Sequence, residues 1–424
     1  MVDRTVIVFS GPGEKPDILG LSLLHRTLLA FHRAGAGRLV LVSAGEDKLP
    51  LALQGRVAMA APQDGEGDVA LALRLAQGDA VVLVAPAVIV GPKDASAILF
   101  ADVPRGGALR VAGGLVHVVS VEALTRANAS LDIASLWAAL PDGLALDMDP
   151  VSLVRRDDGA ATRREIEDQL LRELRKPLEI DGLIGYYVQR PITTRITRLL
   201  ARTPLRPNHL TLLALLVGVS SGFFVATGDT FMTAIGGGLF FLGSFFDCLD
   251  GELARLKFMF SRSGEWLDTL ADDGSTISFL VGMTANLAKR HNSEFITWVG
   301  AITVGSFVLA SLYVYHRVAT IYHTGDVARF QYSFMKESAG VPKTGIMRWA
   351  VFVVKRDFFS AFFFVCAAIG FLEPAFVVSV IGSLGFALAV TVTAAHNMRV
   401  RQPSPAVVVA ASDSQPRRAG RASN

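Results

Sequence analysis

Cysteine is scarce in this chain of 424 residues, which contains only Cys248 and Cys366. The two lie far apart in apolar stretches, so they offer neither a disulfide framework nor metal-ligand spacing. We therefore expect a reducing compartment. The net charge is also small, at +3, and it gives no support for a nucleic-acid partner.

Charged residues are few, at 19%, whereas 51% of the residues are hydrophobic and the mean hydropathy is +0.43. These values indicate membrane spans. We expect no secretory signal, because the apolar run Thr5–Ser10 is too short and a soluble-type sequence follows it. The length predicts two or three domains.

Residues 1–160 show strand and helix patterns in alternation. The helical segments are Leu21–Ala34 and Val69–Ala76. The strand-like runs are Val6–Ser10, Arg38–Ser43, Val57–Ala61 and Ala80–Val84. This alternation predicts a soluble α/β domain with a parallel-type sheet.

Residues 161–206 are expected to be a linker and an interfacial amphipathic helix. Charge is dense from Arg155 to Lys176, as in a solvated linker helix. From Tyr187 to Arg206, arginines recur between Ile and Leu residues, which is typical of a helix on an anionic leaflet. An ordinary surface helix is the alternative, but the hydrophobic span that follows directly favours the membrane.

Residues 207–400 are expected to form an integral membrane domain of six helices. A span needs about 20 residues, and the two shorter runs can be extended through flanking polar residues. The runs are Leu210–Thr227, Phe231–Phe246, Gly274–Leu287, Phe295–Tyr315, Phe358–Leu372 and Pro374–Ala395. Residues 401–424 are rich in Pro, Ser, Ala and Arg and are predicted to be disordered.

Basic residues gather in the loops after spans two and four and in the tail. They include Arg255, Lys257, Arg262, Arg317, Arg329, Lys336, Lys343, Arg348, Lys355, Arg356, Arg399 and Arg401. By the positive-inside rule, both termini and the acidic residues described next lie on the cytoplasmic side. We therefore expect a multi-pass protein of the inner (plasma) membrane.

The segment Phe246–Asp273 carries the candidate chemistry. Asp247 and Asp250 are three residues apart at the end of span two, and Asp268 and Asp272 are four apart at the start of span three. On helices each pair shares one face. Four acids at membrane depth repel one another unless cations compensate them. Ligands that are all oxygen suit Mg²⁺ or Mn²⁺ rather than zinc.

Small and basic residues accompany these acids. Gly251 and Gly264 leave room for a ligand's phosphates, and Arg255, one turn beyond Asp250, can bind a phosphate. Metal ions would neutralise a pyrophosphate while one carboxylate accepts a proton from an attacking hydroxyl. A solvated acidic helix cap needs no such glycines and arginine, and a transporter would carry acids in several spans.

These residues resemble the signature of the CDP-alcohol phosphotransferase (CDP-alcohol phosphatidyltransferase) family. That signature is D-x-x-D-G-x-x-A-R, eight residues, then G-x-x-x-D-x-x-x-D, and this chain matches every position and gap. The stretch Arg206–Thr211 also resembles the family's P-N-x-x-T element. The resemblance covers about residues 181 to 398 and is highly specific.

The resemblance implies that Asp247, Asp250 and Asp268 hold two Mg²⁺ or Mn²⁺ ions and that Asp272 also ligates and acts as the general base. It implies release of CMP and a homodimer formed through membrane helices. The partners are then membrane lipids, a CDP-linked donor and an alcohol acceptor. The residues assigned to the CDP moiety are Asn208, Thr211, Gly251, Ala254, Arg255, Ser261 and Gly264.

The front domain is similar to a nucleotidyltransferase, and the combination resembles the inositol-1-phosphate cytidylyltransferase/di-myo-inositol-phosphate-phosphate synthase fusion type. Two positions depart from that pattern. The glycine loop Ser10–Lys15 lacks the usual arginine, and Val84–Ala87 lacks the metal-binding Asp expected after the central strand. We therefore expect a degenerate domain with a scaffolding or regulatory role.

The substrates stay open at this point. The acceptor could be an inositol phosphate or another phosphorylated polyol, or the donor could be CDP-diacylglycerol, which would make the protein a phospholipid synthase. Basic residues could bind an acceptor phosphate or could only reflect the positive-inside rule; they are Arg317, Lys343, Lys355 and Arg356, with Lys355 and Arg356 favoured.

Two functions of other classes are weaker. Membrane prenyltransferases carry D-D-x-x-D motifs, which D-C-L-D at Asp247–Asp250 does not match. A membrane scaffold with a nucleotide-sensing front domain would not need an intact set of four aspartates.

Overall fold

The computed structural model of the chain describes residues 2–10, 17–43, 49, 53–63, 66–86, 88–111, 115–127, 135, 144–145, 155–156, 160–332 and 355–399. The chain divides into two compact units. The first comprises Met1–Arg175, Arg198–Pro204 and Leu256–Phe258, and the second comprises Lys176–Thr197, Leu205–Arg255 and Met259–Asn424.

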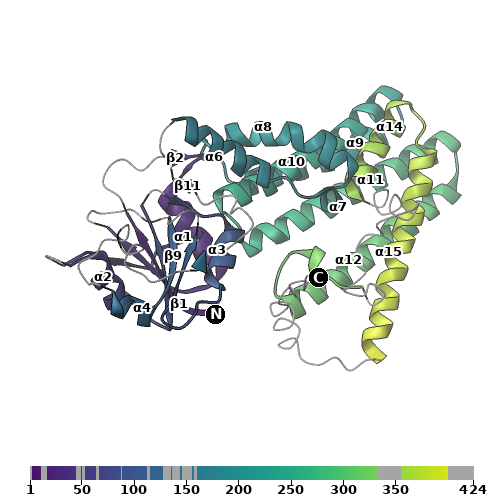
Figure 1. Ribbon diagram of the computed structural model, residues 1–424. Coiled ribbons are helices and arrows are strands. Elements are labelled where there is room, and N and C mark those ends of the chain that lie inside the picture. Colours follow the sequence, from purple (N-terminus) through teal and green to yellow (C-terminus); the bar gives the residue numbers. More distant parts are fainter. Residues whose placement is uncertain are drawn as a thin grey trace, which may run out of the picture. The chain divides into compact units, whose positions relative to one another are not determined.

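The first unit is built on a seven-stranded sheet with the order β10-β8-β9-β6-β1-β4-β5 (Figure 1). The strands are β1 (Val2–Phe9), β4 (Ala36–Val42), β5 (Val57–Ala60), β6 (Ala80–Val84), β8 (Ala108–Val111), β9 (Val116–Ser120) and β10 (Leu144–Ala145). Strands β5, β4, β1 and β6 run parallel, as expected. Strand β9 is antiparallel to β6 and β8, so the sheet is mixed. Four residues separate β8 from β9, too few for a parallel crossover.

Helices cover both faces of this sheet. They are α1 (Leu23–Ala34), α2 (Asp68–Leu75), α3 (Pro92–Leu99) and α4 (Val121–Arg126). Side chains alternate along β1, so Val6 and Val8 pack in one core with α1 and α3. Ile7 and Phe9 pack in the other core with α2 and α4. The unit is therefore a three-layer α/β/α domain.

Short elements complete the first unit. β2 (Asp17–Ile18) pairs with β3 (Leu21–Ser22), and β7 (Val88–Ile89) pairs with β11 (Arg155–Arg156). After β6 the chain continues with Ala85 and Pro86, so no carboxylate directly follows this strand. The glycine loop, at residues 11–16, lies outside the described residues.

The second unit is helical. Its elements are α7 (Leu178–Asp181), the π-helix η3 (Gly185–Gln189), α8 (Arg190–Leu200, whose last turn belongs to the first unit), α9 (Pro207–Ala226), α10 (Thr230–Lys257), α11 (Arg262–His291), α12 (Glu294–Arg317), η4 (Val318–Tyr322), η5 (Val327–Arg329), α14 (Arg356–Ala368) and α15 (Glu373–Arg399). Helix α6 (Ala160–Glu173) precedes them in the first unit.

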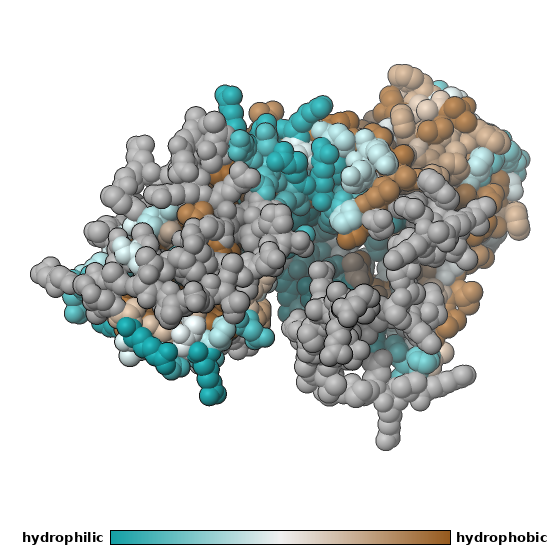
Figure 2. Space-filling view, viewed as in Figure 1, coloured by the Kyte–Doolittle hydropathy of each residue, from teal (hydrophilic) through white to brown (hydrophobic). Residues whose placement is uncertain are grey.

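Four helical segments are long and apolar enough to cross a membrane: Pro207–Ala226, Thr230–Lys257, Glu294–Tyr322 and Glu373–Asn397. Hydrophobic residues are prominent on the surface around α14 and α15 (Figure 2). The chain thus has a membrane-embedded helical domain. The other two expected spans fall on α11, whose first turns carry acids, and on α14, which has 13 residues. The six-span count stays a prediction.

Glycines allow α9 and α11 to pack in close contact. A Cβ added at Gly222 would lie 2.1 Å from the backbone oxygen of Ser278, and one added at Gly218 would lie 2.0 Å from Ser275 Oγ. Such distances are far below van der Waals contact, so only glycine fits at these positions. Ser278 Oγ also donates to the Val219 oxygen at 2.7 Å. This contact fixes α11 against α9, and both helices contribute, together with α10, to the site described next.

Candidate active site

The four aspartates lie on two neighbouring helices. Asp247 and Asp250 are on α10, and Asp268 and Asp272 are on α11. Carboxylate oxygens of Asp247, Asp250 and Asp268 lie within 4.8 Å of one another. Asp250 is buried, at 6% exposure. Three acids at this separation repel strongly in a protein interior unless a cation lies between them.

Helix α9 contributes a hydrogen bond to this cluster. Thr211 Oγ1 donates to Asp250 Oδ2 at 2.6 Å, and Thr211 is itself buried. The bond fixes the orientation of one carboxylate, which is how outer partners commonly position metal ligands. Thr211 lies in the first turns of α9, which begins at Pro207, a residue suited to the first helical position because it lacks an N–H.

Asp272 lies outside the three-carboxylate cluster and pairs with a guanidinium. It forms a close ion pair with Arg356, the first residue of α14, and Arg356 Nη1 also lies 3.7 Å from Asp247 Oδ2. The three-carboxylate cluster therefore contains Asp247, Asp250 and Asp268, while Asp272 faces a guanidinium. Arg356 lies more than 80 residues after Asp272 in the sequence, and the fold brings the two together.

The small residues of the signature leave space around polar groups. A Cβ added at Gly264 would lie 3.0 Å from both Asn208 Oδ1 and Ser261 Oγ. Ser261 caps the start of α11, because its Oγ accepts a hydrogen bond from Gly264 N at 3.0 Å. A Cβ at Gly251 would lie 3.3 Å from Arg255 Nη1. Side chains at either glycine would crowd the residues assigned to the nucleotide.

Arg255 has unused donors. Its Nε and Nη2 are buried, and neither finds a hydrogen-bond acceptor among the described residues. A buried guanidinium without acceptors is costly, so an anionic ligand would stabilise it. Such a ligand would lie close to the acidic cluster, since both belong to one cavity.

That cavity has a volume of about 490 Å³. Every residue that the sequence assigned to the metal or to the CDP moiety lines it: Asn208, Thr211, Asp247, Asp250, Gly251, Ala254, Arg255, Ser261, Gly264, Asp268 and Asp272. The fold thus gathers three separate sequence segments around one space. Their roles there stay predictions.

A strap that the sequence did not reveal forms part of the wall of this cavity. We use the name strap for residues 324–329, of which Asp326–Arg329 line the cavity. Glu265 holds it, because Glu265 Oε2 accepts a hydrogen bond from Gly325 N at 3.0 Å and another, very short, from Thr324 Oγ1. Thr269 Oγ1 donates to the Gly325 oxygen at 2.9 Å. No sequence motif indicated this contact.

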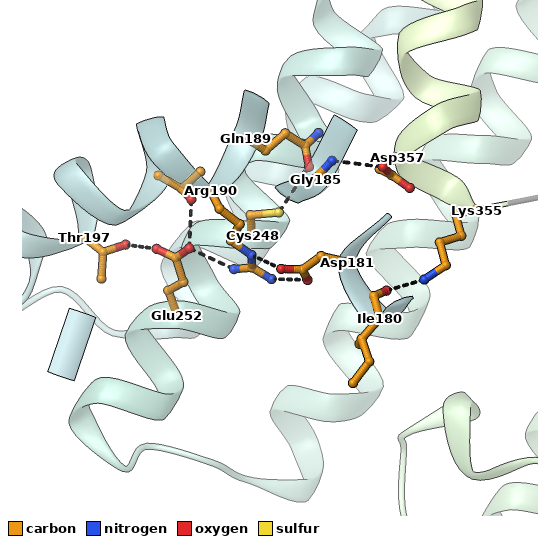
Figure 3. Close-up of polar contacts among 11 residues, drawn as sticks. Ile180, Asp181, Gly185, Gln189, Arg190, Thr197, Cys248, Glu252, Lys355 and Asp357 are labelled. Atoms are coloured by element: carbon orange, nitrogen blue, oxygen red, sulfur yellow. Dashed lines mark hydrogen bonds and ion pairs between the residues drawn. The ribbon is translucent and has the colours of Figure 1, made fainter. Parts of the chain in front are cut away.

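A second cavity, of about 260 Å³, lies beside the first and shares Lys176, Arg190, Asp247 and Cys248 with it. Most of the residues that line it are polar or charged. Lys355 and Arg356, the residues favoured for an acceptor phosphate, both line it. Lys355 Nζ also donates to the Ile180 oxygen at 2.8 Å (Figure 3). Two other basic residues were candidates for the acceptor phosphate. Arg317 does not line either cavity, and Lys343 lies outside the described residues.

A buried ionic network joins the segment before α9 to helix α10, which carries Asp247 and Asp250 (Figure 3). Arg190 binds both oxygens of Asp181, at 2.7 and 2.8 Å, and Glu252 Oε1 at 2.8 Å. Thr193 and Thr197 also donate to Glu252, at 2.8 and 2.6 Å. Burial alone would lower the pKa of Arg190, but hydrogen bonds to Asp181 and Glu252 hold it above its ordinary value. Arg190 therefore stays charged.

Further contacts hold the same segment in place (Figure 3). Gly185 N donates to Asp357 Oδ2 at 2.9 Å. Gly182 has φ +83, and a Cβ there would lie 2.3 Å from Asp357 Oδ1, so the position requires glycine. Cys248 Sγ donates to Gln189 Oε1 at 3.3 Å. The one sequence signal for this network is the presence of charged residues beside apolar spans, namely Asp181, Arg190 and Glu252. That signal does not indicate that the three residues meet.

Known proteins with similar sequences match part of this chain. Residues 205–335 match the family described as CDP-alcohol phosphatidyltransferase. A bifunctional IPC transferase and DIPP synthase of Aquifex aeolicus is 34% identical over 130 residues, which are 31% of this chain and 29% of that protein. A protein of the same name from Thermococcus kodakarensis is 32% identical over 127 residues, 29% of this chain and 28% of the relative.

A third relative is shorter. The archaetidylinositol phosphate synthase of Pyrococcus horikoshii is 30% identical over 117 residues, which are 28% of this chain and 60% of that protein. The chain thus matches less than a third of the length of the two bifunctional relatives.

Proposed function

We propose, from the match of residues 205–335 to the CDP-alcohol phosphatidyltransferase family, that the whole protein is a membrane-embedded, Mg²⁺-dependent CDP-alcohol phosphotransferase. It would move a substituted phosphate from a CDP-linked donor to the hydroxyl of an alcohol and release CMP. The relatives' names point to inositol phosphate or related phospholipid synthesis. The observation that carries the proposal is the cluster of acids on α10 and α11 inside one cavity.

The donor set of this cluster fits a hard divalent cation. Asp247, Asp250 and Asp268 offer only oxygen atoms, at a mutual separation that a bridging cation would relieve. Two Mg²⁺ or Mn²⁺ ions, when bound, would neutralise the pyrophosphate of the donor. The hydrogen bond from Thr211 would keep Asp250 in a ligating orientation.

The donor would occupy the larger cavity. Arg255, with its unpartnered Nε and Nη2, would bind a phosphate oxygen. Asn208 and Ser261, on either side of Gly264, would bind the nucleoside part, and the missing Cβ atoms would let the donor approach the backbone. Polar contacts of this kind orient the scissile bond in line with the incoming hydroxyl.

The acceptor would occupy the smaller cavity. Arg356 is the strongest candidate to bind an acceptor phosphate, because its guanidinium lies at the boundary with the acids. A phosphate held there places the acceptor hydroxyl beside Asp272, which would accept the proton as general base. Lys355 would assist from the same wall. The basic side chains Lys355 and Arg356 in the lining favour an acceptor that carries a phosphate, such as a phosphorylated polyol.

We further infer the arrangement in the membrane. Helices α11 and α14 would complete six spans, with the acids and both termini on the cytoplasmic face of the inner (plasma) membrane. The protein would act as a homodimer. The front domain would be a degenerate nucleotidyltransferase-like domain, since Val84, Ala85 and Pro86 offer no metal ligand. It would bind a partner or nucleotide without turnover.

The experiment is a donor and acceptor panel. Purified full-length protein would be incubated with CDP-inositol or CDP-diacylglycerol, each with inositol phosphate and other polyol phosphates, and CMP release would be measured. Release with CDP-diacylglycerol alone would identify a lipid donor. Absence of CMP from every CDP-linked donor would refute the proposed activity and favour a scaffold.

A further inference from the structure

The strap is anchored against α11 at one glycine. Gly325 is buried, and a Cβ added there would lie 2.5 Å from the backbone nitrogen of Trp266 and 2.9 Å from Glu265 Cβ. Only glycine allows two backbones to approach so closely. The N–H of Gly325 donates to Glu265 Oε2 at 3.0 Å, and its oxygen accepts from Thr269 Oγ1 at 2.9 Å. Both backbone polar groups of this glycine therefore hold the strap on α11.

The rest of the strap is an ordered turn. Asp326 Oδ1 accepts a hydrogen bond from Ala328 N at 3.0 Å, and Arg329 N donates to the Asp326 oxygen at 3.2 Å. The next residue, Phe330, is 8% exposed and packs in a hydrophobic core with residues of α12 and α15. The strap is thus fixed at both ends.

Between these anchors the strap presents exposed side chains in the lining of the larger cavity. They are Val327, Ala328 and Arg329. Val327 is 37% exposed, and Met259 and Phe260, which line the same cavity, are 45% and 48% exposed. A cavity that combines ionic groups with exposed apolar side chains suits a ligand that has a charged part and a flat, less polar part.

These apolar side chains lie toward the start of α11. Met259 and Phe260 directly precede Ser261, the cap of this helix. Asp268 follows Ser261 by seven residues, which is about 10 Å along a helix. The strap contacts α11 at Glu265, between these two positions. If the pyrophosphate of a CDP-linked donor lies at Asp268, its nucleoside lies toward this end of the cavity.

We propose that the strap binds the nucleoside of the CDP-linked donor and that Arg329 hydrogen-bonds to the cytosine. Val327 and Phe260 would pack against the base. Arg329 Nε lies 3.6 Å from Asp326 Oδ2, and the remaining N–H groups of the planar guanidinium match O2 and N3, the two adjacent acceptors of cytosine. Uracil carries an N–H at N3, so the same contact would reject a uridine nucleotide. The inference rests on the proposed function, because it takes the donor to be CDP-linked.

The test measures the binding of CMP and UMP to the full-length protein in detergent with Mg²⁺, by isothermal titration calorimetry. The wild type should bind CMP about 5–150-fold more tightly than UMP, the range for one bidentate contact to a base. Arg329→Gln should weaken CMP binding by that factor and leave UMP binding unchanged. Arg329→Lys should do the same, because an ammonium keeps the charge without the planar fork. A nucleotide bound by the front domain would keep its affinity in both variants and would appear as a separate, unchanged site.

Arg262→Gln is the matched control, because Arg262 is an exposed arginine at the start of α11 that does not line the cavity. It should leave both affinities unchanged. Gly325→Ala should weaken CMP binding although Arg329 is intact, since the added Cβ would displace the strap; unchanged binding would contradict the placement of the strap at the donor.

Two results would overturn the contact between Arg329 and the base. One is an equal loss of CMP and UMP binding in Arg329→Gln, and the other is wild-type CMP binding in Arg329→Lys. Unchanged CMP binding in Arg329→Gln would overturn the inference and leave the proposed function standing. A wild-type protein that binds no CMP would overturn both.

Discussion

The buried network around Arg190 permits a quantitative prediction for Arg190→Gln. The side chains of Arg190, Asp181 and Glu252 are 5%, 6% and 0% exposed. Removing the cation would leave two buried carboxylates without the guanidinium that hydrogen-bonds to both of them. Loss of one partner of a buried ion pair costs about 3–5 kcal/mol. Because the pKa of Arg190 is raised above its ordinary value, the arginine keeps its charge through neutral pH, and at the alkaline end its contribution to stability is lost as the pH rises through that raised pKa.

The assay is a thermal melt of the full-length protein in detergent, followed by tryptophan fluorescence. Trp266 on α11 and Trp298 on α12 report on the helical unit. At about 2–4 °C per kcal/mol for a domain of this size, the loss predicts a Tm lower by roughly 6–20 °C.

Arg198→Gln supplies the control, because its pair with Asp168 is 41% and 50% exposed. An exposed pair contributes about 0–1 kcal/mol, so the Tm of this variant should fall by at most roughly 4 °C. If Arg190→Gln melted within about 2 °C of Arg198→Gln, the network would not stabilise the unit as argued.

Three further variants test the site and its helices. Thr211→Val removes the hydrogen bond to Asp250, so the Mg²⁺ requirement for CMP release should rise about 10–100-fold, whereas Ser220→Ala should leave it unchanged. Gly222→Ala would place a Cβ 2.1 Å from the backbone oxygen of Ser278, so it should lower the free energy of unfolding by about 1–3 kcal/mol. Gly382→Ala is the control, because a Cβ at Gly382 has open space, and it should leave the free energy of unfolding unchanged. Arg356→Gln should lower kcat/KM for a phosphorylated acceptor about 10–150-fold with little effect on the KM for the donor. An equal effect on both substrates would contradict the assignment of Arg356 to the acceptor.

The sequence predicted the gathering of the signature residues because their spacing is local. Pairs three and four residues apart share a helix face, and a short connection between α10 and α11 brings the two pairs together. The elements predicted from periodicity correspond to β1, β4, β5, β6, α1 and α2. No element was predicted at α3, β8, β9 or α4, and periodicity does not report the antiparallel direction of β9.

Contacts over long sequence separations could not be predicted. Arg356 meets Asp272, and Arg190 meets Glu252, only because the tertiary fold brings their helices together. A charged residue near a span has the same sequence pattern whether it follows the positive-inside rule or lies in an ion pair. The contact between Glu265 and the strap could not be predicted either, because Glu265 and Gly325 are 60 residues apart and belong to no motif.

The most direct test of the four-aspartate site is the Mg²⁺ dependence of CMP release by full-length wild-type protein and Asp272→Asn, with a donor that the wild type accepts. The wild type should lose activity with EDTA and recover it with Mg²⁺ or Mn²⁺. Asp272→Asn should bind the donor but release CMP about 10²–10⁴-fold more slowly, as expected for loss of a general base. Wild-type activity that persists in EDTA, or an Asp272→Asn variant with the wild-type rate, would contradict the account.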